Sequence, residues 1–119
     1  MSVLNNLVLA YLGDAVYEVY VREYLIKSGL CKAKDLQKES INYVSAKNQA
    51  RFLEDMLNNN ILNDDEIDII KRGRNAHSHS SKNTDIITYK KSTGLEALIG
   101  YLYLNDKNRL DDIMKEILK

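Results

Sequence analysis

Two acidic side chains stand alone within long apolar stretches of this sequence. Asp14 is the single charged residue among the first 17, and Glu96 is the single charged residue in the segment 92–105. A carboxylate with apolar neighbours is unfavourable unless it is paired, protonated or bound to a metal ion. The alternative interpretation is a structural carboxylate that accepts hydrogen bonds from a neighbouring loop.

The residues around each acid repeat with a helical period. The helical neighbours of Asp14 are Leu7, Ala10, Tyr11, Tyr17, Glu18 and Val21, and those of Glu96 include Tyr89, Thr93, Ile99, Gly100 and Tyr103. Two carboxylates that converge in a core repel each other unless a cation lies between them, and oxygen ligands suit Mg²⁺ or Mn²⁺. The residues therefore predict a divalent-metal site built from Asp14 and Glu96.

Helical periodicity dominates the chain that must position these acids, and it contains no proline and only five glycines. This pattern favours an all-α fold, and the length favours one domain over residues 1–119. Helices are expected at 3–26, 32–42, 46–58, 64 to about 73, 92–104 and 110–118. Leu36 and Ile41 are expected to face inward, and Ser45 and Asn63 are expected to be N-caps.

Composition argues against several other classes of protein. The single cysteine, Cys31, rules out an internal disulfide and is expected to be a small apolar filler. No stretch reaches the roughly 18 uncharged apolar residues of a membrane span, and the first residues lack the features of a secretory signal. We therefore expect a cytoplasmic protein with no membrane partner.

The net charge is zero, but the segment 71–91 is strongly basic. It contains six Lys or Arg residues and one acid, Asp85, and it leads directly into the apolar stretch that carries Glu96. Basic and short polar side chains beside a metal site suit the phosphates and sugars of nucleic acid. The alternative is a solvated loop. The candidate RNA-binding residues are Arg72, Arg74, Asn75, His77, Lys82, Asn83 and Lys90.

Five sequence blocks in order resemble one enzyme family. AYLGDAVYEVYVREYL resembles the signature helix of the ribonuclease III endonuclease domain, and STGLEALIGYLYL resembles the last metal-bearing helix of that family. VSAKNQA (44–50), KRGRNA (71–76) and KNTD (82–85) are similar to the Mini-III subfamily, which lacks a double-stranded-RNA-binding domain. The resemblance runs from about Leu7 to Leu104.

The resemblance implies a ribonuclease III-like helical fold and a metal-dependent endoribonuclease, with Asp14 and Glu96 as catalytic metal ligands and Mg²⁺ or Mn²⁺ as cofactor. It implies hydrolysis of double-stranded RNA to 5′-phosphate and 3′-hydroxyl ends, with maturation of precursor 23S ribosomal RNA and help from a large-subunit ribosomal protein. It also implies a two-fold homodimer, for which Tyr11 and Leu12 are the interface candidates. The alternative for Tyr11 is packing within its own subunit.

The chain departs from the full-length ribonuclease III pattern at two carboxylate positions. Ala10 stands where the wider family has Glu, and Thr93 stands where it has Asp. Mini-III sequences share this thinner pattern, which predicts weaker metal binding with more waters on the ion. Glu18 is either a further contributor or a surface or interface acid. A catalytically silent RNA- or ribosome-binding scaffold of the same fold is the second hypothesis, and an unrelated helical interaction module is the third.

Overall fold

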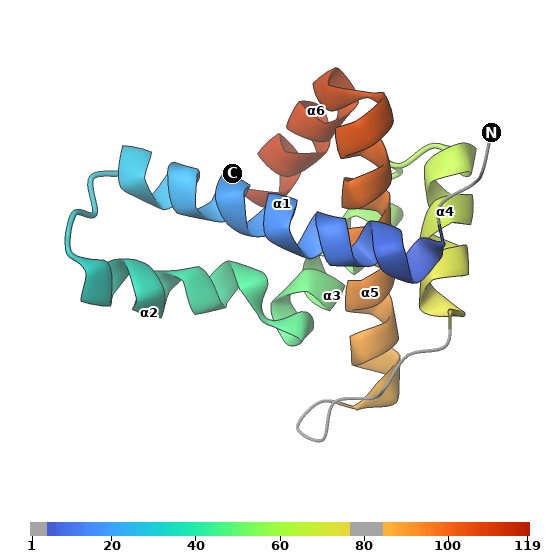
Figure 1. Cartoon of the computed structure of the whole chain (residues 1–119), viewed down its shortest axis with the longest axis horizontal. Helices are drawn as coiled ribbons and strands as arrows, with labels where there is room; N and C mark the ends of the chain where they lie inside the picture. The colour runs from blue at the N-terminus through green and yellow to red at the C-terminus, as the bar shows by residue number, and fades with distance from the viewer. Residues whose placement is uncertain (1–4, 77–84) are drawn as a thin grey trace.

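The computed structural model describes residues 5–76 and 85–119. Within these residues the chain forms helices only, as predicted, and Figure 1 shows their arrangement. The elements are α1 (Asn6–Lys27), α2 (Ala33–Val44), α3 (Ala46–Asn58), α4 (Asp64–Arg74), α5 (Ile86–Asn105) and α6 (Lys107–Ile117). No helix in this part of the chain is both long and apolar enough to cross a membrane.

Side-chain caps begin the helices where the sequence places short polar residues. Ser45 caps α3 by accepting a hydrogen bond from the Asn48 N–H at 3.3 Å, as predicted. Asn63 caps α4 and forms a reciprocal capping box with Glu66, which also agrees with the prediction.

Helix α5 begins six residues earlier than the sequence predicts. Its N-cap is Asp85, whose side chain accepts hydrogen bonds from the Thr88 N–H at 2.9 Å and from the Thr88 hydroxyl at 2.8 Å. Ile86 and Ile87 in the first turn are exposed, so this turn lacks the apolar period that marks a buried helix. The capping residue was the available signal for this start.

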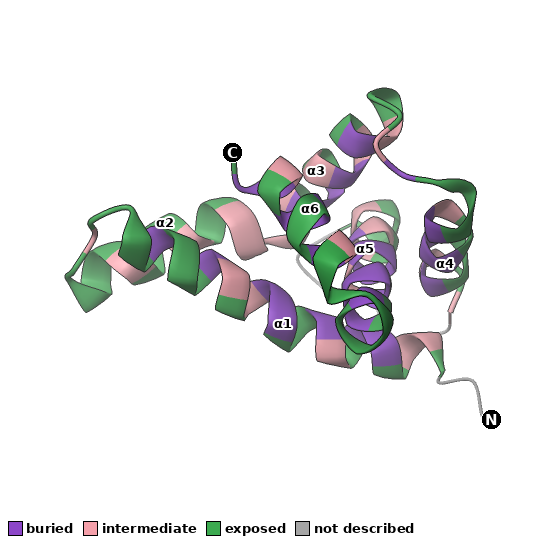
Figure 2. Cartoon of the chain, turned by 90° about the horizontal axis from the view of Figure 1, so that it is seen from above, coloured by how far each residue is buried: buried purple, intermediate pink, exposed green. Residues whose placement is uncertain are grey.

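Helix α5 is the centre of the core. Helices α1, α3, α4 and α6 all pack against it, and Figure 2 shows buried residues along its middle part, which the burial of individual residues places within 92–102. The fully buried side chains of the core include Tyr17, Leu53, Leu95, Leu98, Ile99, Leu110 and Ile113. A helix that is apolar on nearly all faces is expected to be enclosed in this way.

Helices α1 and α5 cross with their backbones in close contact, at two glycines. A Cβ atom on Gly13 would lie 1.7 Å from the Glu96 carbonyl oxygen, and one on Gly100 would lie 2.0 Å from the Leu9 carbonyl oxygen. No larger residue fits at either position without displacing a helix. This crossing fixes the backbone of Asp14 beside that of Glu96.

Helix α2 lies at the edge of the fold, and two predictions made for this region are wrong. It contacts α1 and α3 but has no fully buried residue. Leu36 packs partly against the core, whereas Ile41 is 59% exposed and Cys31 is also exposed. The helical period predicted that Leu36 and Ile41 both face inward, but neighbouring helices cover only one side of α2.

A partly buried ion pair joins α4 to α6. The Arg109 guanidinium donates hydrogen bonds to the Glu66 carboxylate at 2.7 and 2.8 Å and to the Ile61 carbonyl at 2.7 Å. Burial alone would raise the pKa of Glu66, but hydrogen bonds from Arg109 and from the Asn63 N–H, with the Arg109 charge, lower it overall. The pair holds the end of α5 and the start of α6 against α4.

Candidate metal and active site

The carboxyl groups of Asp14 and Glu96 come together at the crossing of α1 and α5. Glu96 is half-buried, and its carboxyl group lies near that of Asp14. Burial, hydrogen bonding with Asp14 and the negative charge of Asp14 raise the pKa of Glu96 to about 8, against an opposing hydrogen bond from Gln49. The two predicted acids therefore form one cluster, in which two negative charges are unfavourable without a cation.

Asp14 is exposed, which corrects the expectation of an acid enclosed by apolar neighbours. Its helical neighbours divide between two faces of α1, because Ala10 and Tyr17 are buried against the core whereas Tyr11 is exposed. Asp14 lies at the border between these faces. The cluster is thus open to solvent on the side of Asp14 and covered on the side of Glu96.

Two further polar side chains surround the cluster, and one was not foreseen. The Tyr17 hydroxyl donates a hydrogen bond to the Tyr43 carbonyl at 2.6 Å, and burial followed by the charge of Glu96 raises the pKa of Tyr17. The Gln49 amide Nε2 donates to Glu96 Oε2 at 3.5 Å, and Gln49 is 1% exposed. The signal for Gln49 was its place one helical turn before Leu53, on the inward face of α3.

Ala10 and Thr93, which replace two carboxylates of the wider family pattern, supply no carboxylate to the cluster. Ala10 is buried, and the Thr93 hydroxyl donates to the Tyr89 carbonyl at 3.0 Å. Glu18 pairs with Arg22 at 3.4 Å on the surface. Within residues 5–76 and 85–119, no group of three or more His, Cys, Asp or Glu residues is placed to hold a metal ion. Two carboxylates with only oxygen donors still fit a hard divalent cation that keeps several waters.

The predicted RNA-binding residues that the structure describes lie at the end of α4 and the start of α5, two helices packed against each other. Arg72 is exposed and pairs with Asp68 at 2.7 Å, whereas Arg74 is half-buried. Asn75 is the C-cap of α4, and Lys90 is exposed on α5. His77, Lys82 and Asn83 lie outside the described residues.

The two interface candidates differ in exposure. Tyr11 is 83% exposed, so the alternative that it packs within its own subunit is wrong. Leu12 is partly buried and packs against the core of its own chain.

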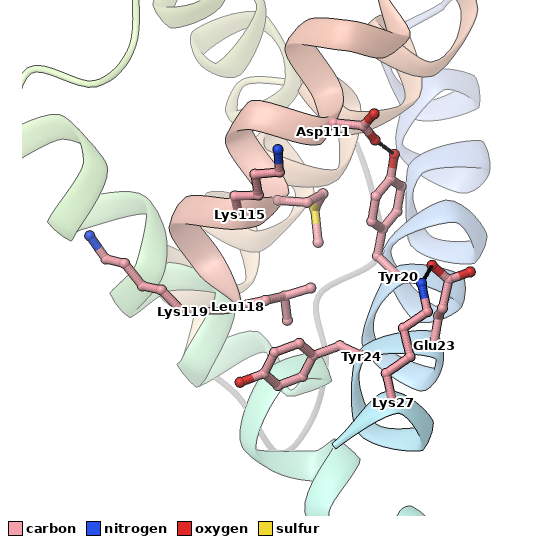
Figure 3. Close-up of a pocket in the computed structure, with 9 residues that line it drawn as sticks. Tyr20, Glu23, Tyr24, Lys27, Asp111, Lys115, Leu118 and Lys119 are labelled. Carbon is pink, nitrogen blue, oxygen red and sulfur yellow. Dashed lines mark hydrogen bonds and ion pairs between the residues drawn. The ribbon is translucent and has the colours of Figure 1, made fainter. Parts of the chain in front are cut away.

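A separate pocket of about 380 Å³ lies between α1 and α6, and Figure 3 shows its lining. The Tyr20 hydroxyl donates a hydrogen bond to Asp111 across it, and Tyr24 and Leu118 form its apolar wall. None of the predicted site residues lines this pocket.

The sequence of residues 7–107 matches the family model described as Ribonuclease III domain. The chain therefore belongs to the ribonuclease III family, and family membership makes it an endoribonuclease. Curated relatives place it more narrowly in the Mini-III group of that family.

Two of these relatives are both named Mini-ribonuclease 3. The protein of Enterococcus faecalis is 46% identical, with 98% of this chain and 89% of the relative covered. The protein of Staphylococcus aureus is 47% identical, with 99% of this chain and 90% of the relative covered. A crystal structure of a Fusobacterium nucleatum protein is similar with a TM-score of 0.83 and 30% identity, covering 93% of this chain and 90% of that one.

Proposed function

We propose that this endoribonuclease cleaves double-stranded RNA by metal-dependent hydrolysis of phosphodiester bonds, leaving 5′-phosphate and 3′-hydroxyl ends. The observation that carries the proposal is the pairing of the Asp14 and Glu96 carboxyl groups at the α1–α5 crossing. In a chain of the ribonuclease III family, this pair is the arrangement expected of catalytic metal ligands.

Asp14 and Glu96 would hold Mg²⁺, with Mn²⁺ as a substitute. When bound, the ion supplies charge for a phosphoryl oxygen and makes water a stronger nucleophile near neutral pH. The exposed carboxylate of Asp14 is the one that substrate can approach, and half-buried Glu96 is held in place by its surroundings. Because Ala10 and Thr93 bring no charge, ion affinity is expected to be modest.

The RNA surface would be formed by the end of α4 and the start of α5. The exposed basic residues there are Arg72 on α4 and Lys90 on α5, the helix that also carries Glu96. Side chains cannot read the deep major groove of duplex RNA, so phosphates and 2′-hydroxyl groups would be the groups contacted. Asn75 and half-buried Arg74 would add polar contacts on the same surface.

A two-fold homodimer would form through one exposed apolar face of α1. Val8, Tyr11, Val19 and Ile26 are 50%, 83%, 62% and 60% exposed, and helical spacing places them on one side of the helix. A two-fold interface must be self-complementary, and a helix face with several exposed apolar side chains can meet its own copy. Asp14 lies at the border of this face, so each site would be close to the dimer axis.

The natural substrate would be precursor 23S ribosomal RNA in the cytoplasm, with a large-subunit ribosomal protein as helper. Similarity to the Mini-III group supports this part of the proposal. The zero net charge is consistent with a helper, because the chain has no overall charge to attract RNA.

The deciding experiment incubates the purified protein with a long RNA duplex, in Mg²⁺ or in EDTA, beside the Asp14→Asn variant. Shortening of the duplex should require both Mg²⁺ and Asp14, because Asn keeps the shape of Asp but loses the anionic ligand. An active Asp14→Asn enzyme would refute the site.

The same gel separates the enzyme from a silent scaffold. The buried methyl group of Ala10 and the internally bonded hydroxyl of Thr93 are the observations that favour a scaffold. Retention of intact duplex in every lane, with the protein bound, would support that second function.

A further inference from the structure

Gln49 is a buried polar residue on an otherwise apolar face. The inward side of α3 is formed by Gln49, Ala50, Leu53 and Met56, and all four are buried. An apolar side chain would suit this position, because burying an amide is unfavourable unless it is hydrogen-bonded. A polar residue at a core-facing position requires a hydrogen-bond partner, and such exceptions to the apolar pattern are typical of functional sites.

The partner is one of the two candidate metal ligands. Gln49 Nε2 donates to Glu96 Oε2 at 3.5 Å, which is long for a hydrogen bond. Hydrogen bonds at catalytic sites are often long before the ligands bind and shorten in the loaded state. The described structure gives Gln49 no other side-chain partner.

The packing of α3 on α5 fixes this contact. Lys91 pairs with Glu54 at 2.8 Å, and Gln49 meets Glu96 farther along the same interface. Moving five residues forward on α3, from Gln49 to Glu54, corresponds to moving five residues back on α5, from Glu96 to Lys91. The two helices are therefore antiparallel where they pack. A rise of about 1.5 Å per residue then keeps both contacts in step.

The start of α3 is also anchored to the helix that carries Asp14. The Tyr17 hydroxyl of α1 donates to the Tyr43 carbonyl at 2.6 Å, two residues before the Ser45 cap of α3. Gln49, the fourth residue of α3, is therefore held between α1 and α5. Two independent contacts, from Tyr17 and from Lys91, set where its amide lies.

We propose that Gln49 is a positioning residue that orients the Glu96 carboxylate for the divalent ion. This inference rests on the proposed function. An N–H bound to one carboxylate oxygen limits rotation of the carboxylate, which lowers the entropy lost when the ion binds. Partners that orient metal ligands typically change ion affinity or activity by about 10- to 100-fold when they are removed.

The test measures Mn²⁺ binding to the RNA-free protein by calorimetry and the Mg²⁺ concentration for half-maximal cleavage. Gln49→Leu fills the same space without an N–H donor, and Gln49→Met is the second variant in case Leu packs badly. Both should weaken Mn²⁺ binding and raise the Mg²⁺ requirement at least about tenfold. The melting temperature should not fall, because an apolar residue suits this face, and KM for RNA at saturating Mg²⁺ should change little.

Met56→Leu is the matched control, since Met56 is buried on the same face of α3 but has no N–H group in its side chain to donate to Glu96. It should leave Mn²⁺ affinity unchanged. Equal Mn²⁺ affinity in wild type, Gln49→Leu and Gln49→Met would overturn the inference. If wild type cleaves the duplex in Mg²⁺ and Asp14→Asn does not, the proposed function survives that failure, whereas absence of cleavage by wild type in Mg²⁺ would refute the function itself.

Discussion

At the scale of single residues, the site depends on a glycine as much as on its acids. Asp14 follows Gly13, and the missing side chain of Gly13 allows the Glu96 backbone to approach α1. The proposed sharing of a cation by Asp14 and Glu96 requires the helices that carry them to be nearly in backbone contact. The acids supply charge, and the glycine sets the separation of the two backbones.

Gly13→Ala should therefore destabilise the protein and reduce cleavage. Alanine in place of glycine in a helix normally stabilises by about 1 kcal/mol, but the added Cβ would lie 1.7 Å from the Glu96 carbonyl oxygen. Forcing α1 and α5 apart is expected to cost about 2 kcal/mol or more. Urea unfolding measures the sign directly, and a more stable variant would show that the helices do not cross so closely.

At the scale of elements, the last turns of α4 hold an ion pair that involves one of the proposed RNA-binding residues. Arg72 pairs with Asp68 one turn earlier at 2.7 Å, and both side chains are more than half exposed. An exposed pair of this kind contributes little to stability, so Arg72 can leave Asp68 for a phosphate at small cost. In the proposed complex, Asp68 would compete with RNA for the same guanidinium group.

Two single variants of α4 should shift RNA binding in opposite directions. Arg72→Ala should weaken duplex binding and reduce the slope of log affinity against log salt by about one unit, since one phosphate contact is lost. Asp68→Asn should strengthen binding by freeing Arg72. Binding is measured over a range of KCl in EDTA, where the proposed metal-dependent cleavage is not expected, and an unchanged slope for Arg72→Ala would remove Arg72 from the RNA surface.

At the scale of the whole molecule, the exposed apolar face of α1 is the feature that a single chain leaves unexplained. Val8, Tyr11, Val19 and Ile26 would all be exposed to water in a monomer. The proposed homodimer would cover this face and bring two Asp14–Glu96 clusters near one axis. Two sites facing one duplex would allow both strands to be cut.

Tyr11→Glu should convert the proposed dimer to a monomer without unfolding the chain. Tyr11 is 83% exposed, so the substitution removes almost no packing within the chain but places a charge in a self-complementary interface. Tyr103→Glu is the control, because Tyr103 is an exposed tyrosine on α5 rather than on the apolar face of α1. Sedimentation velocity measures the mass, and a wild-type monomer at micromolar concentration would refute the homodimer.

The sequence by itself determined the helical class, the family and most helix boundaries. Ser45 and Asn63 cap helices where predicted, because capping depends on a few adjacent residues. Asp85 caps α5 earlier than predicted. The start was missed because Ile86 and Ile87, which follow the cap, are exposed and do not belong to a periodic apolar face. Asp14 and Glu96 could be paired in advance because each is the only charge in its apolar stretch.

Only the tertiary structure decided which helix faces are covered and which polar groups meet. The helical period groups residues on a face, but it does not say what packs there, so Ile41 was wrongly expected to be enclosed. Cys31 was wrongly expected to be an apolar filler, because residue type alone does not determine burial. The exposure of Asp14 and the contact between Gln49 and Glu96 depend on how α1, α3 and α5 cross. Crossings are set by contacts between residues far apart in the chain, such as Gly13 with Glu96, and no local pattern encodes them.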